Sequence, residues 1–460
     1  MPCESPPLQG QPAITVPGAR AGREGAGRDP GPGRRPGSGA ARGHARRAAL
    51  PRAAGFWVVA GVLFLLFFAS AAASPLYRVY QAGWRFSATT LTVVFGVYAL
   101  TLLATLLVFG SLSDYLGRRR VIAVALAAGA GACGLFLAAH GAGLLFAARA
   151  LQGAAAGTAV GALGAALIDL QPEGSGRAPV VSSAAALAGF ALGGLGTSAL
   201  AQYAPAPTHL VWWLLLGASA AAAVAVLAIP DTAPRRPGVL ASLRPRAAVP
   251  RPARGTLAMA LPVMIAAPAL NGFYLSLGPS LAAQVLRSPD LLRGGLVIFL
   301  VTGTGVAATV AFRGLGDPAA MLAGCLFLLV GAVMTLAATE TASAAAFLAG
   351  GAVAGAGVGT GFFLGAYRIL TALASPGQRA GLIAAIWIVY YLAFSVPVVI
   401  AGVATTHFGL HHTAEVYSAA LAVLAAAAAG IFLFRRPSRP RGPAQRHKQG
   451  RTADPQGRGR

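Results

Sequence analysis

The sequence predicts an all-α integral membrane protein with twelve transmembrane helices in two repeated halves of six. The first observation is the composition, which is 56% hydrophobic and only 10% charged, whereas soluble domains carry about 25% charged residues. The second is a series of twelve apolar runs, many of them longer than the roughly 18 residues that cross a bilayer. The third is a polar, Pro- and Arg-rich segment, 230–255, which divides the runs into two sets of six.

Each predicted helix is one of these apolar runs, taken in chain order. The first six are 53–77, 88–109, 121–140, 143–169, 179–201 and 209–229. The second six are 256–284, 294–312, 319–339, 343–370, 380–404 and 413–434. They define two predicted domains, 53–231 and 256–434, joined by a cytoplasmic linker at 232–255.

The two chain ends are predicted to be disordered basic tails. Residues 1–52 and 435–460 are rich in Gly, Pro and Arg and poor in aromatic residues. Such segments bury too little apolar surface to fold. The first tail has no apolar core within its first 30 residues, so we do not expect a signal peptide there.

The positive charge of the chain indicates its orientation. Half of the 36 basic residues lie in the two tails. The tails lack interleaved aromatic residues, so we expect attraction to anionic lipid headgroups and no nucleic-acid binding. Outside the tails, twelve basic residues lie in segments on one side of the predicted membrane and four in segments on the other. The positive-inside rule then predicts a multi-pass protein of the bacterial plasma membrane with both termini cytoplasmic.

No cofactor or metal is expected. The three cysteines, Cys3, Cys133 and Cys325, are scattered and form no metal-binding spacing. The cluster of His407, His411, His412 and Glu415 contains residue types that bind metals. An exposed outer loop is the simpler explanation, because Gly409 interrupts the cluster.

The charged stretch Gly110–Arg120, "GSLSDYLGRRR", lies between the second and third runs. It is not a phosphate-binding loop, which requires a lysine followed by a hydroxyl residue. A basic segment that only stops membrane transfer would explain the arginines but not the carboxylate or the glycines. The stretch resembles the loop motif of the major facilitator superfamily, G-x-L-x-D-x-x-G-R-[R/K]. The matching residues are Gly110, Leu112, Asp114, Gly117, Arg118 and Arg119.

This resemblance implies two pseudo-symmetric six-helix bundles, alternating access and one central site in a monomeric transporter. It also implies a gating function for the motif. Asp114 is expected to face the start of the eleventh helix, near Gln378 and Arg379. The arginines are expected to pair with an acidic group at the inner end of the fourth helix, where Asp169 is the candidate.

A second motif lies in the fourth run, "RALQGAAAG", at 149–157. It resembles the superfamily motif R-x-x-Q-G-x-x-x-G, matched by Arg149, Gln152, Gly153 and Gly157. A charge at the depth of Arg149 is costly in a membrane, which favours a functional residue. The resemblance implies proton coupling or substrate binding for Arg149 and Gln152. The alternative is a structural arginine bonded to backbone carbonyls.

Polar and aromatic residues near mid-membrane are candidates for a substrate cavity. Asn271 is informative because an amide in hydrocarbon needs a partner, and Pro268 and Gly272 beside it indicate a bent helix. For each aromatic residue, core packing is the alternative. The candidates are Tyr98, Asn271, Tyr274, Trp387, Tyr390 and Tyr391.

The function expected from these patterns is secondary active transport of a small, neutral or anionic organic solute by proton-linked efflux. Proton-coupled uptake of a sugar or organic acid is the alternative within the class. The segment 189–198 matches the exporter motif of the superfamily only at its first glycines, and no Asp or Glu lies at mid-membrane to carry a proton. A membrane-embedded enzyme is disfavoured, because the sequence has no catalytic cluster.

Overall fold

A computed structural model describes residues 50–230, 247–375 and 378–434. These residues belong to one compact unit, Arg47–Arg460. The described part of the chain contains twelve helices that are long and apolar enough to cross a membrane. The predicted all-α transmembrane fold is therefore confirmed. The expected tails and most of the linker lie outside the described residues, and the predicted domain boundaries stay a prediction.

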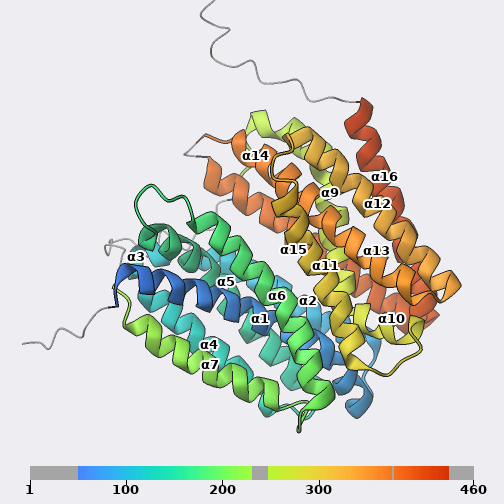
Figure 1. Cartoon of the computed structure of the whole chain (residues 1–460), viewed down its shortest axis with the longest axis horizontal. Helices are drawn as coiled ribbons and strands as arrows, with labels where there is room; N and C mark the ends of the chain where they lie inside the picture. The colour runs from blue at the N-terminus through green and yellow to red at the C-terminus, as the bar shows by residue number, and fades with distance from the viewer. Residues whose placement is uncertain (1–49, 231–246, 376–377, 435–460) are drawn as a thin grey trace, which may run out of the picture. The chain divides into compact units, whose positions relative to one another are not determined.

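The described part of the first half contains seven helices, coloured blue to green in Figure 1. They are α1 (Arg52–Trp84), α2 (Ala88–Phe109), α3 (Ser113–Leu116), α4 (Arg118–Leu137), α5 (Ala142–Leu170), α6 (Ala178–Tyr203) and α7 (Leu210–Leu227). All except α3 are candidate membrane spans. The short helix α3 lies within the charged stretch identified in the sequence.

The second half, coloured yellow to red, repeats this arrangement with more interruptions. Its helices are α9 (Arg251–Ser276), α10 (Gly278–Val285), α11 (Leu291–Ala311), α12 (Asp317–Thr341), α13 (Ala344–Gly357), η1 (Val358–Tyr367), α14 (Arg368–Ala372), α15 (Arg379–Phe408) and α16 (Leu410–Phe434). The elements α13, η1 and α14 form one span, and η1 is a π-helix.

The helix of Asn271 is not broken beside Pro268 and Gly272, where the sequence predicts a bend or break. α9 continues through Asn271 to Ser276. The interruption lies at Leu277, between α9 and α10. Pro279 stands in the first turn of α10, where a missing backbone N–H costs nothing and the proline favours a new helix start.

The same helix pairs pack together in both halves. In the first half, α1 packs on α6, α2 on α5, and α4 on both α5 and α7. In the second half, α9 packs on α15, α11 on α13, and α12 on both α13 and α16. These pairs occupy equivalent positions in each set of six spans, so the two bundles are built as structural repeats.

Glycines allow the closest of these contacts. Gly157 of α5 lies against α2, where an added Cβ would come 2.9 Å from the backbone nitrogen of Leu106. Gly355 packs equivalently on α11, where a Cβ would lie 2.8 Å from the Val301 carbonyl carbon. Small residues at such positions let helix backbones approach closely in lipid. The glycine-rich fourth and tenth spans therefore have the same packing function.

We call the end of the bundles that carries the 110–117 connection the motif end, and the end that carries the 85–87 connection the opposite end. The two bundles meet along α2 with α15 and along α6 with α11. Toward the opposite end, the Thr89 and Thr406 hydroxyls lie 2.9 Å apart. On the other seam, the Leu291 backbone N–H donates to the Gln202 side-chain oxygen at 2.9 Å.

Candidate functional site

Three charged residues of the first bundle converge at the motif end. Arg118 donates from Nε to Asp169 at 2.9 Å and from Nη1 to Asp114 at 2.6 Å. It also donates to the Ser113 hydroxyl at 3.0 Å. Arg118 therefore joins the connection between α2 and α4 to the end of α5, and two carboxylates share one guanidinium.

The local backbone explains this geometry. Gly117 has a φ of 93°, a conformation that is inexpensive only for glycine, and it separates α3 from α4. The turn brings the Asp114 carboxylate within reach of Arg118, four residues later in the chain. Arg119 turns toward the end of α7 and donates to the carbonyls of Leu227 at 3.3 Å and Ile229 at 3.4 Å.

The two remaining members of this motif have packing functions. Gly110 follows α2 and faces Gly161 of α5, where an added Cβ on Gly161 would lie 2.8 Å from the Gly110 oxygen. Leu112 is partly buried against the hydrophobic core at the motif end of the first bundle. Together they bring the connection close enough to α5 for Arg118 to reach Asp169.

Asp114 pairs within its own bundle in this structure. Its side chain is 50% exposed and pairs with Arg118. Among the described residues, no hydrogen bond or ion pair joins Asp114 to Gln378 or Arg379. The hydrogen bonds and close side-chain contacts described above between the bundles lie toward the opposite end, so the expected partners on α15 are not brought to Asp114 in this state.

A second ion pair at the motif end was missed from the sequence. Arg368 at the start of α14 pairs with Asp317 at the start of α12, with Nε donating at 2.5 Å. Its Nη2 also donates to the Leu315 carbonyl at 2.7 Å. The sequence signal was an arginine inside a helical run, with an aspartate at the N-terminus of the preceding span.

Arg149 lies in the core of the first bundle with 1% of its surface exposed. Its Nη1 donates to the Gln152 side-chain oxygen at 2.6 Å and to the Ser70 carbonyl at 3.2 Å. The Gln152 amide donates in turn to the Ala69 carbonyl at 2.9 Å. Arg149 and Gln152 thus act as one unit that ties α5 to the middle of α1.

Aromatic rings cover the guanidinium of Arg149. Its central carbon lies 4.1 Å from the ring centre of Tyr98 and 6.0 Å from that of Tyr77, a distance range in which a cation is attracted to the ring face. The Tyr98 hydroxyl donates to the Ser70 hydroxyl at 2.7 Å. Tyr77 and Ser70 were missed in the sequence, although their spacing of seven residues places them on one helix face.

The candidates of the second bundle form an aromatic cluster. The Trp387 ring lies 5.4 Å from that of Tyr390 and 5.7 Å from that of Tyr391. The Asn271 amide lies beside the Tyr390 hydroxyl, a polar neighbour of the kind that the sequence required. The Phe394 ring lies 6.1 Å from that of Tyr390 and 5.1 Å from that of Phe95 in the first bundle. Helix α2, which carries Phe95 and Tyr98, therefore adjoins both Arg149 and this cluster.

Tyr274 lies apart from the other candidates. Its hydroxyl shares a 2.5 Å hydrogen bond with Thr335 of α12, and its ring packs 5.8 Å from Phe347. Tyr274 is 1% exposed. These contacts lie inside the second bundle, so the structure supports the core-packing alternative for this residue.

The acidic residues of the described chain lie away from Arg149. Asp114, Asp169 and Asp317 form the motif-end ion pairs. Glu415 pairs with His411 at 2.8 Å and His412 at 3.3 Å. No group of three potential metal ligands occurs among the described residues.

Comparisons with known proteins agree with this architecture. A family model described as the Major Facilitator Superfamily matches residues 59–359. No curated protein matches the sequence.

Solved structures of transporters share the fold at low sequence identity. A bacterial homologue of the human lysosomal transporter Spinster, inward-facing and unoccupied, aligns with a TM-score of 0.68 at 14% identity, covering 86% of this chain and 100% of that one. The nucleoside transporter NupG aligns with a TM-score of 0.65 at 11% identity, covering 84% of this chain and 100% of that one. The human organic anion transporter MFSD10 aligns with a TM-score of 0.60 at 18% identity, covering 83% of this chain and 100% of that one.

Proposed function

The chain belongs to the Major Facilitator Superfamily and is a secondary transporter, and we propose that it carries a small organic anion by alternating access. The observation that supports this substrate class is the buried guanidinium of Arg149. A charge buried in a membrane protein is costly unless a counter-charge or water compensates it. An anionic substrate would supply that counter-charge.

The surroundings of Arg149 are neutral. Its hydrogen-bond partners are the Ser70 carbonyl and the Gln152 amide, and its Nε is buried without a hydrogen-bond partner. No Asp or Glu of the described chain forms an ion pair with it. Arginine stays protonated in proteins, so this side chain keeps its charge, and its planar fork suits a carboxylate.

The aromatic cluster supports an organic rather than an inorganic anion. Trp387, Tyr390 and Tyr391 present apolar ring surface, with the Asn271 amide beside them. Tyr98 of α2 lies against Arg149, and Phe95 of the same helix packs on Phe394 beside this surface. We propose that the charged head of the substrate meets Arg149 and Gln152 while its apolar part packs on the cluster.

Outward, proton-linked movement is also part of the proposal. A membrane potential that is negative inside drives an anion outward, by about 2.3 kcal/mol per charge for each 100 mV. Proton linkage rests on the resemblance of the motif at Arg149 and Gln152. Proton-coupled uptake of a sugar or organic acid is the second candidate, and the direction of flux separates the two.

We propose that the motif-end residues form a gate. Asp114, Arg118 and Asp169 would hold the ends of α4 and α5 together as the bundles rock. When the motif end closes, the half-exposed Asp114 would meet the start of α15 near Gln378 and Arg379. In this structure the close contacts between the bundles lie at the opposite end, as an inward-facing state requires if the motif end is cytoplasmic.

We propose a monomer in a bacterial plasma membrane with both termini cytoplasmic, contacts to anionic headgroups and no catalytic step. Topology is testable at two exposed sites, Glu173 at the motif end and Pro207 at the opposite end. An impermeant thiol reagent on intact cells should label Pro207→Cys and not Glu173→Cys. The reverse pattern would overturn the orientation.

A thermal-unfolding screen of the purified protein tests the substrate class. The probes are hippurate, phthalate and 4-toluenesulfonate, each with its uncharged amide. A ligand that binds only the folded state raises its stability, so we expect at least one acid to raise the Tm and its amide to have no effect. Arg149→Gln should reduce the shift, whereas Arg85→Gln, at the opposite end, should keep it in full.

Flux in proteoliposomes completes the test. The stabilising acid should move down an imposed potential, with an accompanying pH change inside the vesicles. Amides that stabilise as strongly as their acids, or an unchanged shift in Arg149→Gln, would contradict an anionic substrate. Flux without any pH change would remove proton linkage alone.

A further inference from the structure

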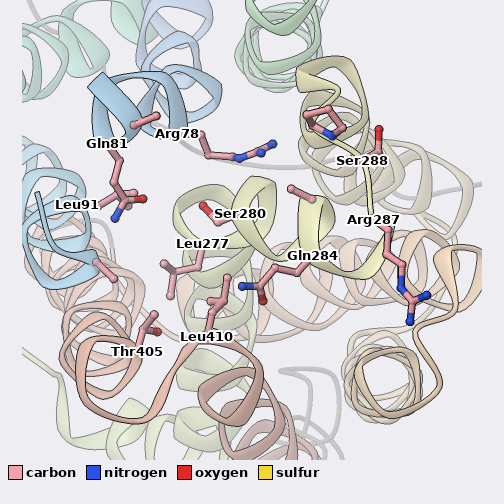
Figure 2. A pocket seen from close by; sticks show the side chains of 14 residues that line it. Arg78, Gln81, Leu91, Leu277, Ser280, Gln284, Arg287, Ser288, Thr405 and Leu410 are labelled. Atoms are coloured by element: carbon pink, nitrogen blue, oxygen red, sulfur yellow. The ribbon is translucent and has the colours of Figure 1, made fainter. Parts of the chain in front are cut away.

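A cavity of about 650 Å³ opens at the opposite end of the molecule (Figure 2). Side chains of α1, α2, α10, α15 and α16, together with the 286–290 connection, line it. Its volume lies within the range of roughly 300–1,000 Å³ typical of small-molecule sites. None of its lining residues belongs to the Arg149 site or to the aromatic cluster.

Polar groups from two helices face this cavity. Figure 2 shows Arg78 and Gln81 of α1 opposite Ser280 and Gln284 of α10. The Nη1 atom of Arg78 is buried and has no hydrogen-bond partner among the described residues. The Gln81 amide nitrogen donates to the Phe86 carbonyl at 3.1 Å. The Arg78 cation and several hydrogen-bonding side chains therefore face the same cavity.

No acidic residue in the cavity lining balances the positive charge of its arginines, Arg78 and Arg287. The acids next along the chain from lining residues are engaged elsewhere: Asp290 binds the Leu292 backbone N–H and Arg293, and Glu415 pairs with two histidines. The electrostatic potential in the cavity is therefore positive, which favours an anion.

Most of the remaining lining is apolar. Leu91, Leu277 and Leu410 form one wall of the cavity. A small inorganic anion would leave this wall unused, whereas an organic anion with a short apolar body would cover it.

We propose that this cavity is a second anion site, which binds a small organic carboxylate with its charged group on Arg78 and its body against the leucines. Gln81 and Gln284 would complete the hydrogen bonds of the carboxylate. The site lies beside the α2–α15 contact, since Ala88 and Thr405 line it. It does not depend on the central site taking the same ligand.

Protection of an introduced cysteine tests the site. Ser280→Cys places a thiol in the lining, in a chain with Cys3 replaced by Ser; Cys133 and Cys325 are buried. Modification by neutral N-ethylmaleimide is followed by mass spectrometry of the purified protein. Hippurate should slow modification at least five-fold, and its amide should have no effect.

Charge variants in the Ser280→Cys background make the test specific. Arg78→Gln should remove the protection by hippurate, and Arg78→Lys should retain part of it. Arg287→Gln is the matched control, because it removes the same charge from a side chain whose head turns away from the cavity in Figure 2. Thermal unfolding checks that each variant is folded.

The outcomes separate this site from the central one. Protection should persist in Arg149→Gln, whatever that substitution does to transport. Equal protection by the amide, equal loss in Arg78→Gln and Arg287→Gln, loss in Arg149→Gln, or no protection of Ser280→Cys would each overturn the proposal.

Discussion

Arg368 pairs with Asp317 across 51 residues, the same separation that joins Arg118 to Asp169, and the charges are exchanged. In each bundle the first residue of one helix binds the motif end of the next span. The first bundle places its cation at the helix start, and the second places its anion there. An Asp at a helix N-terminus also gains from the helix dipole.

These two ion pairs should differ in their contribution to stability. The Asp317 and Arg368 side chains are 36% and 37% exposed, and exposed pairs contribute about 0.2–1 kcal/mol. Arg118 is 15% exposed and binds three acceptors, and bonds to charged groups contribute about 1.5–3 kcal/mol. Arg118→Gln should therefore lower the Tm in detergent more than Arg368→Gln. Equal shifts would contradict the difference in burial.

Asp114→Asn should impair transport with little effect on folding. Loss of the half-exposed Asp114 carboxylate leaves Arg118 still paired with Asp169. Expression and Tm should stay near wild type, while flux of the stabilising anion should fall several-fold. Asp169→Asn is the comparison, since it removes the better buried partner and should lower the Tm further. Wild-type flux in Asp114→Asn would remove Asp114 from the proposed gate.

Gly157→Ala should destabilise the first bundle. The added methyl would overlap the backbone of α2 near Leu106, and overpacking costs about 1–3 kcal/mol. Gly164→Ala on the same helix is the matched control, because nothing lies within 4 Å of its added Cβ and alanine favours a helix by about 1 kcal/mol. Thermal unfolding should rank Gly157→Ala below wild type and Gly164→Ala at or above it.

A disulfide between positions 89 and 406 should arrest transport. The hydroxyls of Thr89 and Thr406 lie 2.9 Å apart on opposite bundles, so Thr89→Cys with Thr406→Cys should cross-link under mild oxidation. Flux should stop and return on reduction, because alternating access requires this end to open. Thr89→Cys with Thr309→Cys is the unlinked control. Full flux in the cross-linked protein would contradict a moving opposite end.

The transmembrane helices were accessible from sequence because hydropathy is a local property. The run 88–109 coincides with α2, and the other runs differ from their spans mainly at the ends. The differences arise where polar residues such as Arg118 and Asp317 begin a helix. A hydropathy criterion leaves these residues out of the predicted helix, although their backbone conformation makes them its first residues.

The candidate site was only partly accessible from sequence. Arg149, Gln152 and Tyr98 do lie together, and Asn271 does meet Tyr390. Tyr274 was assigned to the cavity because depth along a helix gives no information about which way a side chain faces. The Arg368–Asp317 pair joins residues 51 positions apart, and the bond from Arg149 to the Ser70 carbonyl joins residues 79 positions apart. No local sequence pattern predicts such pairs.

By itself, the sequence determined the membrane class, the two sets of six helices and the motif that resembles the superfamily, since composition, run length and spacing are one-dimensional properties. Only the tertiary structure decided which end of the bundles is in contact, which carboxylates share Arg118, and that no acidic residue of the described chain pairs with Arg149 or Arg78. These features depend on contacts between helices that are distant along the chain. Burial then sets the cost of each charge, and burial exists only once the helices have packed.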